Sequence, residues 1–158
     1  MLDSTTLSYV IIRSLPESIL FMLAGFILLN LKIDKSRIIR IGLLFGIIVT
    51  VIRSLPIAYG IHTILGMMIG GFILIKITEV PLAHGVMATC GIFISLAMSE
   101  GIYIGITTGL LRMDIDKLVA PNATGAIMSL PSLGIFIGIV MIMKSLFNKI
   151  NTRSRFAK

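Results

Sequence analysis

Apolar residues run along this chain in long stretches that are separated by short polar segments. A helix needs about 17–25 mostly apolar residues to cross a bilayer. The pattern predicts five spans, at residues 15–31, 38–59, 61–78, 82–111 and 130–147. We therefore expect residues 1–158 to form a single all-α membrane domain, a polytopic bundle of about five transmembrane helices.

Two of the predicted spans begin at a Ser-Leu-Pro sequence. Ser14 followed three residues later by Glu17 is the pattern of a capping box, and proline is tolerated in the first turn of a helix. Ser129 and Pro131 open the last span in the same way. We expect both helices to start at these serines.

The composition excludes a soluble domain. Hydrophobic residues make up 56% of the chain and charged residues 13%, and the mean hydropathy is +1.05. Soluble domains are about 45–50% apolar and about 25% charged. A small soluble domain could not bury so much apolar surface. The start of the chain has no basic segment, so we expect no cleaved signal peptide.

The basic residues fix the expected orientation. The net charge is +7, and ten of the fourteen Lys and Arg residues fall into three groups, which are Lys32, Lys35, Arg37 and Arg40; Lys76; and Lys144, Lys149, Arg153, Arg155 and Lys158. With the N-terminus outside and the C-terminus inside, all ten lie on the cytoplasmic side, as the positive-inside rule requires. We expect the chain to lie in a bacterial cytoplasmic membrane, with the lipid bilayer as its surroundings. No aromatic-interleaved basic stripe suggests a nucleic-acid partner.

Short sequences recur along the chain. Residues 12–16 (Ile-Arg-Ser-Leu-Pro) return at 52–56, and residues 25–28 (Gly-Phe-Ile-Leu) return at 71–74. In the expected topology each Ser-Leu-Pro precedes a helix that runs from outside to inside. The recurrence therefore suggests a parallel internal repeat, although chance matching in so simple a composition is the alternative.

Ionisable residues at membrane depth are costly and are therefore candidates for function. Glu100 is expected in the outer third of the bilayer, in a fourth helix that is either long and tilted or broken near this residue. Arg13 and Glu17 are four residues apart and can pair on a helix, whereas Arg53 needs an acid from another helix. We predict that Glu100 contacts Arg13 or Arg53, and that the cluster lies beside Glu17 and His62. These five residues are the candidate ligand-binding or coupling site, with a capped helix entry and a structural ion pair as the simpler interpretations.

His84 and Cys90 are the remaining residues with candidate chemistry. A cysteine nucleophile needs a base within hydrogen-bond reach, and six residues along a helix turn these two side chains about 120° apart. We therefore expect a structural cysteine, no enzyme activity, and neither a disulfide nor a metal site or other cofactor. The ten Met residues are expected to fill the core.

The pattern of the chain resembles the membrane input domains of GHKL-type sensor histidine kinases of Firmicutes. The resemblance rests on residues 13–17 before the first span, the basic loop 32–40, residues 53–56 followed by 60–63, the long span with Glu100, and Leu130-Pro131. It implies a sensor whose helices receive a signal and pass it to a cytoplasmic partner. The chain carries no phospho-acceptor or ATP-binding motif, so we expect either a stand-alone relative or a subunit whose partner is a separate kinase or other cytoplasmic signalling subunit.

Other functions remain open from the sequence. The repeat and the broken helix ends fit a small transporter or a substrate-binding membrane subunit, and a purely structural or assembly protein is a further alternative. An intramembrane cysteine peptidase that processes signalling peptides is the alternative with the least support. Small-residue faces at Gly66/Gly70 and Gly134/Gly138 are expected to pack within the chain, with a homodimer as the alternative.

Overall fold

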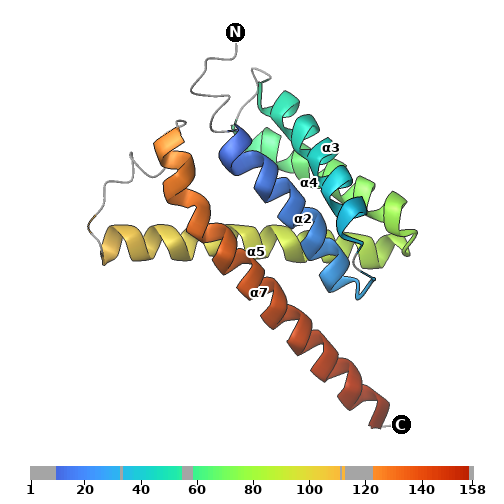
Figure 1. Ribbon diagram of the computed structural model, residues 1–158. Coiled ribbons are helices and arrows are strands. Elements are labelled where there is room, and N and C mark those ends of the chain that lie inside the picture. Colours follow the sequence, from blue (N-terminus) through green and yellow to red (C-terminus); the bar gives the residue numbers. More distant parts are fainter. Residues whose placement is uncertain (1–9, 33, 55–58, 111, 113–122, 157–158) are drawn as a thin grey trace.

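The computed structural model describes residues 10–32, 34–54, 59–110, 112 and 123–156 (Figure 1). Side chains are described for these residues except 54, 59, 60, 62, 63 and 147–156. The described part of the chain is helical and contains no strand. Its elements are the π-helical turn η1 (Val10–Ser14) and the α-helices α2 (Leu15–Leu28), α3 (Lys35–Ser54), α4 (Tyr59–Thr78), α5 (Leu82–Gly109) and α7 (Ala123–Phe156).

Three of these helices are long and apolar enough to cross a membrane. They cover Val10–Leu28, Leu82–Gly109 and Ala123–Leu146, and Ile64–Thr78 in α4 is a shorter apolar helix. Large apolar side chains such as Leu44, Met68, Phe72 and Leu110 are exposed on the surface. Exposed apolar surface on this scale is unusual for a soluble monomer, so the chain has the character of a membrane protein.

Helix α2 lies at the centre of the bundle. It packs along α3 and also contacts α5 and α7, while α5 packs along α7 and α4 (Figure 1). Phe21 of α2 meets Phe45 of α3 with ring centroids 5.1 Å apart, and meets Phe93 of α5 edge to face at 5.2 Å. The core continues through Leu74, Ile92, Phe136 and Val140, so every helix contributes to it.

Glycines set the closest helix contacts. A Cβ added at Gly42 of α3 would lie 2.6 Å from the Ile19 Cα of α2, and one at Gly46 would lie 2.8 Å from Leu15. These two glycines are four residues apart and form a small-xxx-small face, which lets two helices approach closely. The α2–α3 pair is therefore held by a glycine face that the sequence analysis did not single out.

The turn between α2 and α3 is built from local hydrogen bonds. Asn30 adopts a left-handed φ of 55°, and the N–H groups of Asn30 and Leu31 donate to the carbonyls of Ile27 and Phe26. This is the Schellman arrangement that ends a helix. Asp34 then accepts hydrogen bonds from the backbone N–H groups of residues 36 and 37 and caps α3.

The predicted helix start at Ser129 is wrong, and Ser14 precedes α2 as predicted but forms no capping box. Ser14 has helical φ and ψ and makes no capping bond, because the helix already begins upstream in η1. Pro131 lies inside α7, which begins at Ala123. The Ser129 hydroxyl donates to the Ala126 carbonyl of its own helix instead of capping a new one.

The predicted fourth span is a single helix. α5 continues from Leu82 to Gly109 without a break at Glu100-Gly101, which resolves the choice between a long helix and a broken one. Residues 113–122, which precede α7, lie outside the described residues.

Candidate functional site

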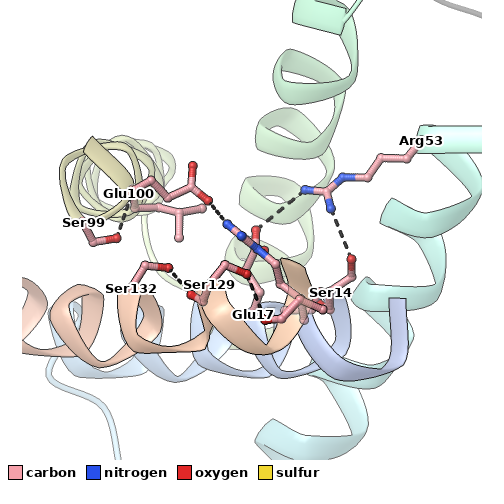
Figure 2. Close-up of polar contacts among 11 residues, drawn as sticks. Ser14, Glu17, Arg53, Ser99, Glu100, Ser129 and Ser132 are labelled. Atoms are coloured by element: carbon pink, nitrogen blue, oxygen red, sulfur yellow. Dashed lines mark hydrogen bonds and ion pairs between the residues drawn. The ribbon is translucent and has the colours of Figure 1, made fainter. Parts of the chain in front are cut away.

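Arg13 is the centre of an ionic cluster at the start of α2. It lies in the π-helical turn η1, three residues before Pro16. A proline ring clashes with the backbone one turn earlier, and a wider turn is one way a helix relieves that clash. The wide turn presents Arg13 to α5, where its Nη2 donates to the Glu100 carboxylate in a close ion pair (Figure 2).

Glu17 joins the two arginines of the cluster. Its Oε2 lies 3.7 Å from the Arg13 Nε, one helical turn back, and its Oε1 lies 3.7 Å from the Arg53 Nη2. Arg53 comes from the last turn of α3 and also donates from Nη1 to the Ser14 Oγ over 3.2 Å. Two guanidinium groups and two carboxylates from α2 with η1, α3 and α5 therefore form one connected network (Figure 2).

The four side chains differ in exposure. Those of Arg13 and Glu17 are 13% and 15% exposed, whereas those of Arg53 and Glu100 are 47% and 39% exposed. A buried charge persists only when it is paired and hydrogen-bonded. The largely buried Arg13 and Glu17 therefore hold the network together, and the side chains of Arg53 and Glu100 each remain partly exposed.

Helix α7 adjoins the cluster through η1, against which it packs. Ser129 and Ser132 lie on α7 beside the cluster (Figure 2), and both are buried. The Ser132 hydroxyl donates to the Ser129 carbonyl over 2.7 Å, and Ser99 of α5 donates to the Leu96 carbonyl over 2.7 Å. These hydroxyls thus donate to carbonyls of their own helices, and their small side chains allow α2, α5 and α7 to pack closely.

Tyr103 links the same part of α5 to α7. It lies three residues after Glu100, and its hydroxyl donates to the backbone carbonyl of Met128. Pro131, three residues after Met128, lacks an N–H and disturbs the hydrogen-bond ladder of α7 at this point. The carbonyl freed in this way is that of Ile127, four residues before the proline, and the Tyr103 bond to the neighbouring Met128 carbonyl fastens α5 to this turn of α7.

The predicted contact between Glu100 and Arg13 or Arg53 is confirmed, and the partner is Arg13. The pairing of Arg13 with Glu17 is confirmed as well, and Arg53 finds Glu17 rather than Glu100. His62 belongs to α4, but its side chain lies outside the described residues. Tyr103 was not predicted, because nothing in the sequence indicates which tyrosine of α5 reaches a backbone carbonyl of α7.

His84 and Cys90 both lie on α5. The His84 side chain is exposed, while Cys90 is half-buried and carries a free thiol. No hydrogen bond joins these two described residues. Among the described residues there is also no group of three or more His, Cys, Asp or Glu side chains that could hold a metal ion.

The predicted small-residue faces pack only in part. Gly70 meets Phe45 and Phe21, as expected for packing within the chain. Gly66 is buried, as packing within the chain requires, but Gly134 and Gly138 are exposed and have no described neighbour within 4 Å of an added Cβ, so the prediction is wrong for the α7 face. The reason is that α7 meets α2 and α5 through a different face, which carries Leu133, Phe136 and Val140.

No protein-family model matches the chain, and no curated protein or solved structure matches it either. The geometry of the cluster is therefore the basis for assigning a role.

Proposed function

We propose that this chain is a signal-receiving domain of a bacterial cytoplasmic membrane, which passes a signal to a cytoplasmic partner such as a kinase. In this proposal five helices cross the bilayer, with the N-terminus outside and the C-terminus inside. The ionic cluster of Arg13, Glu17, Arg53 and Glu100 lies at the outer end and receives the signal. The resemblance to sensor kinase input domains supports the same role.

The observation that carries the proposal is the connection between the cluster and α7. Glu100 pairs with Arg13, and Tyr103 on the next turn of α5 donates to Met128 of α7. A ligand that disrupts the ion pair between Glu100 and Arg13 changes how α5 is held against η1. The same segment of α5 holds α7 at its proline, so a change at Glu100 reaches the helix that leads toward the C-terminus.

The exposure of the cluster fits an input site. Arg53 and Glu100 are the more open members, and the described residues leave part of each accessible. A conformational change requires a ligand to interact differently with two states. Breaking or keeping the Arg13–Glu100 pair provides such a difference, because an incoming anion can take the place of Glu100 on Arg13.

The distribution of charge supports the orientation. Arg37 at the start of α3 donates to the carbonyl of Ile77 at the end of α4. This contact gathers the basic turn before α3 and the basic end of α4 on one side of the bundle, away from the α2 start that carries Arg13. Basic residues on one side and a neutral ion-pair cluster on the other match the positive-inside rule.

The alternatives from the sequence have less support. The transporter hypothesis relied in part on broken helix ends, and both α5 at Glu100 and α7 at Pro131 continue as helices. A peptidase needs a base on the thiol of Cys90, and His84 forms no hydrogen bond with it in the described part of the chain.

A distance measurement between α5 and α7 tests the proposal. Spin labels at Met87→Cys and Met141→Cys, in a Cys90→Ala background, use two exposed positions whose replacement disturbs no core contact. We expect Glu100→Gln to shift or broaden the distance distribution, while the helix content by circular dichroism stays that of the parent. Glu79→Gln, at an exposed carboxylate outside the cluster, is the matched control and should leave the distribution unchanged.

Identical distributions in Glu100→Gln and the parent would contradict a coupling role and leave only a structural ion pair. Equal shifts in Glu100→Gln and Glu79→Gln would also contradict it, because the effect would then follow charge in general and not the cluster.

A further inference from the structure

An open depression of about 380 Å³ lies between the start of α3 and the end of α4, away from the ionic cluster. Arg37, Arg40 and Ile41 of α3 and Ile77 of α4 line it. It therefore combines two guanidinium groups with an apolar wall from two helices. This combination suits a ligand that is anionic at one end and apolar at the other.

Both arginines keep hydrogen-bond donors available. Arg37 donates from Nη2 to the Ile77 carbonyl over 3.1 Å, and Arg40 donates from Nε to the Ser36 carbonyl over 3.4 Å. Each guanidinium has five N–H donors, so these bonds position the groups without using up their donors. Within the described residues neither arginine forms an ion pair with a carboxylate.

The depression lies at the level where lipid headgroups are expected. Ile77 is next to the last residue of the apolar helix Ile64–Thr78, and Arg37 and Arg40 lie in the first turns of α3. Lys76 beside Ile77 extends over the exposed ring of Phe72, with its Nζ 5.9 Å from the ring centroid. A lysine stem that covers an apolar surface while its ammonium reaches outward is typical of the membrane interface.

The surrounding charge is positive. Near the depression the chain carries Lys32, Lys35, Arg37, Arg40 and Lys76 against the carboxylates of Asp34 and Glu79. Asp34 is engaged with the backbone N–H groups at the start of α3. The two exposed carboxylates are outnumbered by these basic side chains, so the net charge around the depression is positive.

We propose that this depression binds the headgroup of an anionic phospholipid. The phosphate lies between the guanidinium groups of Arg37 and Arg40, since arginine matches phosphate geometry with paired N–H donors. The glycerol and the first acyl carbons lie against Ile41 and Ile77. Basic pockets between membrane helices bind anionic headgroups in this way, and the proposal does not depend on the role of the ionic cluster.

The test is a binding titration on the full chain in a neutral detergent. The probe is phosphatidylglycerol with a fluorescent acyl chain, compared with phosphatidylcholine that carries the same chain. Arg40→Gln is the main variant, because Arg40 bonds only within α3, whereas Arg37 also ties α3 to α4. Lys144→Gln on α7 removes the same charge at a residue that does not line the depression and is the matched control.

We expect Arg40→Gln to weaken phosphatidylglycerol binding about fivefold, since one cation near an anionic lipid contributes about 1 kcal/mol. Lys144→Gln should leave the affinity unchanged, and phosphatidylcholine should bind more weakly to the parent. Arg40→Lys should recover part of the affinity, because the charge returns without the paired donors.

Three outcomes would overturn the proposal. Unchanged binding in Arg40→Gln would exclude Arg40 from the site. Equal weakening in Lys144→Gln would indicate diffuse attraction to all basic residues. Displacement of the probe by millimolar inorganic phosphate would indicate an anion site that takes its ligand from solution and not from lipid.

Discussion

The ion pair between Arg13 and Glu100 should contribute measurable coupling energy between α2 and α5. Glu100→Gln removes one charge but leaves Arg13 paired with Glu17. Glu100 is also 39% exposed, so solvation offsets part of the loss. We expect this variant to lower the free energy of unfolding by about 1–2 kcal/mol, in the lower range for charged hydrogen bonds.

Arg13→Gln should cost more. Arg13 contacts both carboxylates, and Glu17 is 15% exposed. Removing one partner of a largely buried pair leaves an uncompensated charge, which costs about 3 kcal/mol. In the double variant the unpaired Glu100 charge is gone as well, so the two losses should not add.

The coupling energy from the double-mutant cycle should be about 1–2 kcal/mol. This exceeds the average of about 0.6 kcal/mol for hydrogen bonds between membrane helices, because both partners here are charged. Unfolding in a denaturing detergent can be followed by circular dichroism, since the chain contains no Trp. Glu79→Gln combined with Arg13→Gln is the control cycle and should be additive. A coupling energy below about 0.5 kcal/mol, which counts as additive, would refute the pairing.

Other predictions concern packing and Cys90. Gly42→Ala should destabilise the protein by about 1–3 kcal/mol, because the new Cβ would lie 2.6 Å from the Ile19 backbone. Gly134→Ala places its Cβ in open space and should be nearly neutral in the same unfolding assay. Equal effects of the two variants would contradict the role of the glycine face. Tyr103→Phe removes the bond to the Met128 carbonyl and should cost about 0.5–1.5 kcal/mol in that assay, and no change would contradict the proposed link between α5 and α7. Cys90→Ala should leave insertion and stability nearly unchanged, and a loss of peptide processing in cells with normal insertion would contradict the prediction of no enzyme.

The elements of the fold follow well from the apolar pattern. The first span was predicted to end at residue 31, close to the end of α2 at Leu28 and the left-handed turn at Asn30. The capping box at Ser14 and the helix start at Ser129 were wrong for a common reason. A serine before a proline marks a helix start only if the preceding residues are not helical, and here apolar residues on both sides keep the helix going.

The candidate site was predictable in its charges but not in its connections. The cost of placing Glu100 in an apolar helix required a cationic partner, and two arginines were available. The choice of Arg13 depends on the wide turn at Pro16, and the link from Tyr103 to Met128 depends on the register of α5 against α7. Neither is encoded by local spacing, since both arise from how whole helices pack.

The proposals share one arrangement, in which the ionic cluster is outside and the Arg37–Arg40 depression is inside. Single cysteines at Ser36 and Thr124, both exposed, in a Cys90→Ala background test it directly with a membrane-impermeant thiol reagent on intact cells. Ser36→Cys at the start of α3 should react only after the cells are permeabilised, and Thr124→Cys at the start of α7 should react at once. Labelling of Ser36→Cys but not Thr124→Cys in intact cells would show the opposite orientation and contradict the account.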